Sequence, residues 1–312
     1  MSELPDLFEG RPESVGGRYM LGGRLGTGGV AEVFLATDQQ SDTRCAVKLM
    51  RIPFGARKAV GTRFLAEAKV MSKIRHPNIP RVIGAGKEGA YYWFAMRYAR
   101  GGSLAQKLRR DGILDELGAL RIVFEVTSAL VAVHAMDLVH RDVKPDNILL
   151  SSAGEVLLAD FGIARHPEGS VPMRTRPGEL MGTRGYRSPE QEDSAHDAEA
   201  PADLYGVAAT LFTSLTGKPP RRLWDQPELF EPLRPEIAAL IRKGTHPDLA
   251  ERFVDARSMA AEIAAVADVV AADSAGEPVA AAWMAELDAA NRGEPAPGLG
   301  ARLWSTVSRW LA

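Results

Sequence analysis

The first hundred residues show the short apolar runs of β-strands. Between residues 19 and 50 the best strand patterns are 33–35 and 45–50, and the turn-rich residues 38–42 separate them. Two further strand patterns lie at residues 80–86 and 90–98. This part of the chain therefore predicts a small sheet.

One helical pattern interrupts these strands at about residues 60–75. Phe64, Ala68 and Met71 recur at i, i+4 and i+7, which places them on one face of a helix. His76-Pro77-Asn78 follows, and proline disfavours helical geometry in the residue before it. The helix is therefore predicted to end there.

After Gly101-Gly102 the spacing of apolar residues becomes helical. Residues 115–135 carry an apolar stripe with Asp115 as the expected N-cap, and residues 203–216 form an apolar helix that Gly217 closes. A small hairpin is expected at 148–150 and 156–159, and further helices at about 234–243 and 255–267. A strand-rich half followed by a larger helical half predicts an α+β fold with two lobes.

Composition narrows the class of protein. The chain has 312 residues, of which 46% are hydrophobic and 25% charged, which is the profile of a globular domain in water. The formal net charge of −2 argues against a nucleic-acid partner, and there is no run of about 18 apolar residues to span a bilayer. The single cysteine, Cys45, excludes an intrachain disulfide, and the acidic N-terminus is unlike a signal peptide. We therefore expect a cytoplasmic protein.

Residues 25–33 are glycine-rich, with Gly26, Gly28 and Gly29. Glycines let backbone N–H groups approach phosphate oxygens closely. A dinucleotide-binding fingerprint needs a helix directly after the glycines, whereas a strand pattern follows here, and the Gly-Lys-Ser/Thr of a Walker loop is absent. A phosphate loop between two strands and an ordinary glycine-rich turn both stay open on this segment alone.

Lys48 lies within the apolar strand pattern. A buried lysine needs an anionic partner because an unpaired buried charge is costly, and Glu67 on the following helix is the expected partner. The alternative is a lysine whose ammonium group reaches solvent. Its position, one strand after the glycine-rich segment and one helix before an acid, favours the ion pair.

The densest group of candidate chemistry lies at residues 140–150, which read His-Arg-Asp-Val-Lys-Pro-Asp-Asn-Ile-Leu-Leu, and Asp160-Phe161-Gly162 follows ten residues later. Asp142 would orient an attacking hydroxyl and accept its proton, and Lys144 would offset charge on a transferring phosphoryl group. Asn147 and Asp160 supply the oxygen ligands that Mg²⁺ prefers. A solvated charged turn is the alternative, but it would not require all these parts in this order.

These motifs resemble those of the protein kinase family, and the chain is similar to the eukaryotic-like (Hanks-type) serine/threonine kinases of bacteria. The lysine two residues after Asp142 is the serine/threonine type of arrangement. The resemblance implies a two-lobed protein-kinase-like α+β fold, with a small antiparallel-sheet N-lobe at 18–98 and a helical C-lobe at 99–267. Residues 1–17 are then expected as a flexible leader and residues 268–312 as a C-terminal tail.

The resemblance also implies an activity: transfer of the γ-phosphoryl group of ATP, with Mg²⁺ or Mn²⁺, to serine and threonine hydroxyls of protein substrates. In this arrangement Asp142 and Lys144 are catalytic, Lys48 binds the α- and β-phosphates and pairs with Glu67, and Asn147 and Asp160 hold the metal. The implied nucleotide pocket consists of Gly26, Thr27, Gly28, Gly29, Val33, Ala46, Lys48, Met96 as gatekeeper, Tyr98, Ala99 and Leu149. The implied internal spine consists of Met71, Val82, His140 and Phe161, with Asp203 anchoring its base.

Two positions depart from the family pattern. Ala31 replaces the third glycine of the loop, and because alanine is small we expect only a modest effect. Arg97 stands where the family has a hinge acid, so backbone contacts to adenine would survive while the hinge electrostatics differ.

Residues 182–190 resemble the end of a kinase activation segment. Thr183 stands where the family has the threonine that bonds the catalytic Asp and Lys and favours serine/threonine substrates. Glu190 is expected to pair with a buried arginine, which we take to be Arg252; an ordinary helix-surface arginine is the alternative.

Regulation by phosphorylation is a further expectation. Arg141 precedes the catalytic Asp, and kinases with that arginine commonly need an activation-loop phosphate to balance it. Between residues 162 and 183 the only hydroxyls are Ser170 and Thr175. Thr175 is the predicted autophosphorylation site because arginines flank it on both sides; a threonine that is never modified is the alternative.

The last 45 residues predict a partly helical linker at 267–300 and a short amphipathic helix at 301–312. Packing of this helix on its own protein is favoured over contact with a membrane because only two residues of it are basic. A nucleotide-binding pseudokinase scaffold and a small-molecule kinase are the competing functions. Transient homodimers that phosphorylate each other also stay open.

Overall fold

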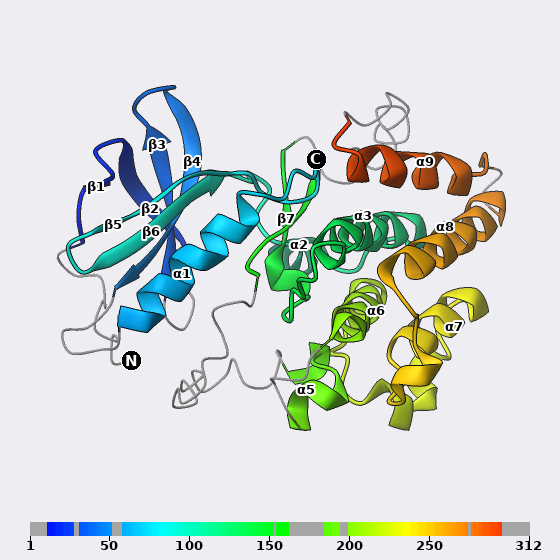
Figure 1. Cartoon of the computed structure of the whole chain (residues 1–312). Coiled ribbons are helices and arrows are strands. Elements are labelled where there is room, and N and C mark those ends of the chain that lie inside the picture. The colour runs from blue at the N-terminus through cyan, green and yellow to red at the C-terminus, as the bar shows by residue number, and fades with distance from the viewer. Residues whose placement is uncertain are drawn as a thin grey trace. The chain divides into compact units, whose positions relative to one another are not determined.

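The computed structural model describes residues 11–27, 31–51, 58–152, 154–161, 184–193, 199–273 and 276–294. These residues form two compact units (Figure 1). The N-terminal unit holds residues up to Ile74 together with 80–98, and the C-terminal unit holds residues 75–79 and the described residues from Ala99 onward. Each unit is built around its own core.

The N-terminal unit is an antiparallel sheet with one helix. The six strands lie in the order β1-β2-β3-β4-β6-β5. Their bounds are β1 Ser14–Val15, β2 Tyr19–Thr27, β3 Ala31–Asp38, β4 Thr43–Arg51, β5 Val82–Glu88 and β6 Tyr91–Arg97, and the helix is α1, Lys58–Met71. Strands that follow each other in sequence pair directly, except β4 and β5; β4 pairs instead with β6, and α1 and β5 lie between these two strands in the chain. The sequence pattern predicted this sheet and this helix.

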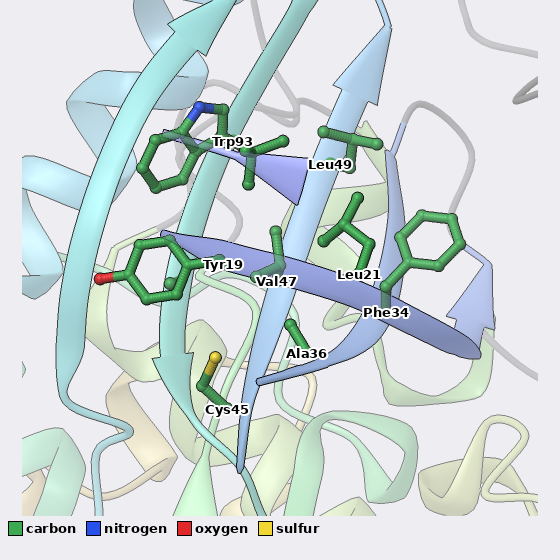
Figure 2. Packing of buried hydrophobic residues seen from close by; sticks show 10 residues of the cluster. Tyr19, Leu21, Phe34, Ala36, Cys45, Val47, Leu49 and Trp93 are labelled. Carbon is green, nitrogen blue, oxygen red and sulfur yellow. The ribbon is translucent and has the colours of Figure 1, made fainter. Parts of the chain in front are cut away.

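An apolar cluster fills one part of this sheet (Figure 2). Its members are Val15, Tyr19, Leu21, Phe34, Ala36, Cys45, Val47, Leu49, Trp93 and Ala95. The rings of Tyr19 and Trp93 tilt against each other with centroids 5.5 Å apart, a favourable aromatic geometry. Alternate residues of β4 enter the cluster, so Lys48 between Val47 and Leu49 points to the other side of the strand.

The start of the described chain belongs to this cluster. Val15 is fully buried, and Ser14–Val15 pairs with β2, although the sequence placed residues 1–17 in a flexible leader. Gly16 and Gly17 both have positive φ, which glycine adopts without strain, and they turn the chain from β1 into β2. A side chain at Gly16 would collide with Trp93, 2.5 Å away. The strand was missed because two residues carry no periodicity.

Helix α1 packs on β6 through aromatic side chains. Phe64 lies 5.1 Å from Phe94 between ring centroids, and the face of Phe64, Ala68 and Met71 is buried as its spacing predicted. Gly61 lies against the ring of Tyr92 so closely that a Cβ there would be 2.3 Å from it. This close approach sets how near α1 lies to the sheet.

The C-terminal unit is helical with one hairpin. Its helices are α2 Leu104–Asp111, α3 Glu116–His134, α5 Pro189–Asp193, α6 Ala200–Thr216, α7 Pro235–Gly244, α8 Ala256–Asp273 and α9 Ala280–Asn291. The hairpin pairs β7 Ile148–Leu150 with β8 Val156–Leu158. Asp115 caps α3 through the backbone N–H of Gly118, and Gly217 ends α6 in the left-handed region, as predicted.

Helix α3 is the core element of this unit. Among the described helices it is the one long and apolar enough to cross a membrane. This differs from the expectation that the sequence holds no such run of about 18 apolar residues. Of the apolar 18-residue stretch of α3, 67% is buried inside the protein, where the helix packs against α6, α8 and α9. An apolar helix covered on several sides is what the centre of a helical core requires.

The segment at 267–300, expected to be a partly helical linker, does contain helix, and that helix packs on the core. Helix α8 runs to Asp273, and α9 follows and lies against α3 and α8 (Figure 1). Trp283 of α9 is buried and its ring lies 5.1 Å from that of Phe124. Alanine marks neither a buried nor an exposed face of a helix, so the alanine-rich sequence did not indicate that α9 packs on the core. Residues 301–312 lie outside the described residues.

A buried histidine follows α1, in the segment that belongs to the C-terminal unit. His76 Nδ1 accepts the backbone N–H of Asn78 at 3.1 Å, and its Nε2 lies 3.3 Å from the hydroxyl of Ser128. The ring is therefore assigned as neutral, with its proton on Nε2. Burial lowers the pKa of His76 to about 4.

We predict that His76 makes this protein less stable in mild acid. Its pKa in the folded state lies below the value of about 6.5 in the unfolded chain, so the unfolded state binds the extra proton between these values. This histidine should therefore remove about 2 kcal/mol from the free energy of unfolding between pH 7 and pH 5. Urea titrations of the parent protein and His76→Gln across this range measure the effect. Equal pH dependence in both proteins would contradict it.

Candidate active site

Lys48 and Glu67 form an ion pair within the N-terminal unit. Lys48 Nζ lies 3.5 Å from Glu67 Oε1, and the two side chains are 15% and 1% exposed. The lysine also lies 5.6 Å from the centroid of the Phe94 ring. The expected pair is therefore present, and α1 supplies the anion that a half-buried lysine on β4 requires.

The glycine-rich segment connects two paired strands. Gly26 and Thr27 lie at the end of β2, opposite Val33 and Glu32 of β3. A strand rather than a helix follows the loop, which excludes the dinucleotide-binding arrangement. Gly28 and Gly29 lie outside the described residues.

The predicted adenine-pocket residues divide between the two units. Ala46 and Met96 are buried and directly opposite each other on β4 and β6, and Val33 pairs with Lys48 in the same sheet. Tyr98 ends the N-terminal unit, and Ala99 begins the C-terminal unit. Leu149 lies in β7 of the C-terminal unit, where it pairs with Ser103 just before α2. Arg97, at the end of β6, is exposed.

Residues of α6 hold the loop at 140–147 in place. Asp203 accepts the backbone N–H groups of His140 at 2.8 Å and of Arg141 at 2.7 Å, and its side chain is buried. His134 contacts the same carboxylate at 2.9 Å. One turn further along α6, a side chain at Gly206 would lie 2.7 Å from the carbonyl oxygen of Val143. Asp203 thus occupies the anchoring place expected of it.

His134 and Gly206 were missed as supports of this loop. A glycine inside a helix, three residues after a buried acid, is a signal that the backbone of another segment comes close. For His134, the sequence pattern indicated only a place on the apolar stripe of α3.

Asp142 is surrounded by the two residues predicted to act with it. Asn147 donates from Nδ2 to Asp142 Oδ2 at 2.7 Å and to the Asp142 carbonyl at 2.7 Å. Lys144 Nζ lies 3.3 Å from Asp142 Oδ2. All three side chains are buried, so charge and hydrogen bonds act here with little screening by water.

The second metal-site candidate, Asp160, lies next to Asn147 in the fold. The hairpin continues past β8, where Ala159 donates its N–H to the carbonyl of Asn147 at 2.9 Å, and Asp160 is the next residue. Asp160 has a φ of 61° and Arg141 a φ of 67°, conformations that non-glycine residues adopt only when the surroundings impose them. An amide oxygen and a carboxylate from adjacent strand ends are a donor set that suits a hard divalent cation.

His140 connects the loop to the end of β8. Its Nε2 bonds the carbonyl oxygen of Ala159 at 2.9 Å, and its ring packs against Phe161 at 4.7 Å between centroids. Burial lowers the pKa of His140, so the ring is neutral and its Nε2 carries the proton. Two of the four predicted spine residues are thus in contact; Met71 and Val82 belong to the N-terminal unit, where Met71 is buried and Val82 half-buried.

Glu190 and Arg252 form a bidentate ion pair. Arg252 donates from Nη1 and Nη2 to the two carboxylate oxygens of Glu190 at 2.7 and 2.9 Å, and its guanidinium lies over Tyr205. Burial pulls the pKa of Glu190 upward, but the hydrogen bonds from Arg252 and Ser188, together with the charge of Arg252, leave the pKa below its ordinary value. The neighbouring Gln191 donates to the Arg141 carbonyl at 3.2 Å, so α5 also contacts the loop.

Three predicted residues of the activation segment, Ser170, Thr175 and Thr183, lie outside the described residues. The described segment resumes at Arg184 and leads into α5.

Residues 19–263 match the family model described as the protein kinase domain. The chain belongs to this family. It is 34% identical over 214 residues to a probable serine/threonine-protein kinase PknB of Bifidobacterium longum, covering 66% of this chain and 31% of that protein. It is 30% identical to the serine/threonine-protein kinase PknL of Mycobacterium tuberculosis, covering 81% of this chain and 67% of that protein.

Solved kinase structures resemble the fold as well. The crystal structure of the Mycobacterium tuberculosis PknI kinase domain superposes with a TM-score of 0.61 at 28% identity, covering 78% of this chain and 94% of that one. The family and the two-lobed α+β class expected from the sequence are therefore confirmed. The chain spans only about a third of the length of the PknB relative.

We predict that Arg252→Met destabilises this kinase domain by about 3 kcal/mol, because it leaves the Glu190 carboxylate half-buried without its partner. The control is Arg257→Met, which removes a surface pair with Asp288 and should change stability by at most about 1 kcal/mol. Urea unfolding at pH 7 measures both. Similar losses in the two variants would contradict the prediction.

Proposed function

We propose that this protein is an ATP-dependent serine/threonine protein kinase that uses Mg²⁺ or Mn²⁺ and phosphorylates hydroxyls of protein substrates. The observation that carries the proposal is the buried group of Asp142, Asn147 and Lys144. Family membership supports use of ATP and a divalent cation, and the relatives named above are serine/threonine-protein kinases.

Asp142 would receive the substrate hydroxyl. Its carboxylate is held by Asn147 and Lys144 on a loop that Asp203 anchors, so the acceptor oxygen has a defined position before substrate arrives. As the hydroxyl oxygen attacks the γ-phosphorus, the bond from that phosphorus to the β–γ bridging oxygen would break and ADP would leave, while the proton of the hydroxyl would pass to this carboxylate. Such positioning, rather than covalent catalysis, supplies most of the rate enhancement in phosphoryl transfer.

Charged and polar residues would bind the nucleotide and its cation. Lys48 would bind the α- and β-phosphates, and Glu67 keeps its ammonium group in place. Asn147, through its amide oxygen, and Asp160 would hold the divalent cation. When bound, the cation neutralises charge on the phosphate oxygens. Lys144, beside Asp142, would offset charge on the phosphoryl group in transfer.

The pseudokinase alternative lacks a specific observation in its favour. The residues that phosphoryl transfer needs, Lys48, Glu67, Asp142, Asn147 and Asp160, are all present in the chain. The Ala31 and Arg97 departures alter neither the Lys48–Glu67 pair nor the contacts of Asp142.

Activation by phosphorylation is part of the proposal. Arg141 lies next to Asp142, and its Nε is buried without a hydrogen-bond acceptor among the described residues. A phosphate on the activation segment would supply the anion, because phosphate oxygens are strong acceptors for a guanidinium group. Thr175 is the proposed site, since Arg174 and Arg176 flank it. The expectations of a cytoplasmic location, of transient homodimers and of a tail that packs on its own protein stay predictions.

We predict that Asp142→Asn lowers kcat for phosphoryl transfer by about 10²–10⁴-fold, because the amide cannot accept the proton. Nucleotide binding should persist. The matched control is Asp146→Asn, an exposed acid of the same loop, which should retain activity. Radiolabelled ATP with Mg²⁺, with and without a generic basic protein substrate, provides the assay. Nucleotide binding without transfer in the parent protein would support the scaffold instead.

We predict that Thr175→Ala reduces both activity and incorporated phosphate, whereas Ser170→Ala changes them little. The reason is that Arg141 would lose the anion that balances it. Intact-mass spectrometry after incubation with ATP counts the phosphates, and initial rates on a peptide report activity. Unchanged phosphate content and rate in Thr175→Ala would remove this part of the proposal.

A further inference from the structure

A buried arginine connects α9 to α3. Arg121 of α3 donates from Nε to Glu125 Oε1 at 2.7 Å and from Nη2 to Glu286 Oε2 of α9 at 2.5 Å. The three side chains are only 11%, 7% and 10% exposed. The guanidinium also lies over the Trp283 ring of α9, 5.1 Å from its centroid. Helix α9 therefore covers this charge with both an aromatic ring and a carboxylate.

The other oxygen of Glu125 faces the hairpin. Glu125 Oε2 accepts the Asn78 amide at 2.8 Å and the backbone N–H of Val156 at 3.4 Å. Asn78 in turn donates to the Val156 carbonyl at 2.9 Å and accepts the N–H of Leu158 at 2.8 Å. Strand β8 is thus held on one side by β7 and on the other by Asn78 and Glu125.

The proposed metal ligand follows closely after β8. Two residues after Leu158 comes Asp160, in its constrained conformation with φ of 61°. A chain of contacts therefore runs from Glu286 through Arg121 and Glu125 to the strand that carries the proposed metal ligand. All of its members belong to the C-terminal unit.

Electrostatics makes Arg121 the critical member of this chain. Glu125 is buried, and burial raises its pKa, while Arg121 opposes that rise through its charge and its hydrogen bond. Without the arginine, an ionised Glu125 would be an uncompensated buried charge, and a protonated one would be a poorer acceptor for two N–H groups. Either outcome weakens the hold on β8.

We propose that Arg121 is a positioning residue for Asp160, and that α9, through Glu286 and Trp283, holds Arg121 in place. Helix α9 lies beyond residue 263, where the match to the family model ends, so this chain adds the support from outside the matched region. The consequence for catalysis rests on the proposed kinase function. The consequence for the order of β8 does not.

The first test compares Arg121→Met, Glu125→Gln and the double variant in the full chain. Hydrogen–deuterium exchange of the amides at 154–161, without nucleotide, should be about tenfold faster in Arg121→Met. Glu125→Gln keeps an acceptor oxygen but needs no counter-charge, so the double variant should return exchange to within about twofold of the parent protein. Unchanged exchange in Arg121→Met, or a double variant as fast as Arg121→Met, overturns the proposal. Should Arg121→Met fail to fold, Arg121→Lys with and without Glu125→Gln replaces it under the same criteria.

The second test addresses α9 itself. Glu286→Ala should accelerate exchange at 154–161. Asp288→Ala, also on α9, removes only a surface pair with Arg257 of α8 and should not. If the kinase function holds, the Mg²⁺ concentration for half-maximal activity should rise about three- to tenfold in Arg121→Met and return in the double variant. Equal exchange in the Glu286 and Asp288 variants overturns the role of α9. Exchange as expected in a protein that transfers no phosphate would leave the positioning intact and reject the proposed function.

Discussion

The active-site loop depends on the two hydrogen bonds that the Asp203 carboxylate accepts from backbone N–H groups. Arg141 has a left-handed backbone, which is unfavourable for arginine and persists only where neighbours enforce it. Asp203 bonds the N–H of this residue and of the one before it, from inside the apolar helix α6. The carboxylate is buried and α6 is packed on other helices. The loop that carries Asp142 is therefore fixed to the helical core.

Three sets of buried charges in this protein join elements that are distant in the chain. Lys48 with Glu67 joins a strand to α1, and Glu190 with Arg252 joins α5 to the segment before α8. Arg121 with its two glutamates joins α3 to α9. Such pairs add little net stability because desolvation offsets attraction, but removing one partner is costly. Their effect is to require one arrangement of these elements, which is what a site assembled from several of them needs.

Local signals in the sequence predicted most of the elements. Asp115 and Gly217 marked helix ends because capping depends only on neighbouring backbone groups, and the face of Phe64, Ala68 and Met71 followed from helical spacing. The same reasoning failed for β1, which is two residues long, and it did not predict that α9 packs on the core, because the alanines of α9 mark no face. Their burial is decided by Trp93 and by Phe124, which lie far away in the chain.

The chemistry of the candidate site was readable from the sequence because its members are close together. Asp142, Lys144 and Asn147 span six residues, so one loop carries all three and their order could be read directly from the chain. The supports of the site were decided by tertiary structure alone. Gly206 against Val143, and Arg121 against Glu286 at a separation of 165 residues, meet only because the helices pack as they do. No pattern of neighbouring residues encodes such a meeting, since it results from the packing of the whole core at once.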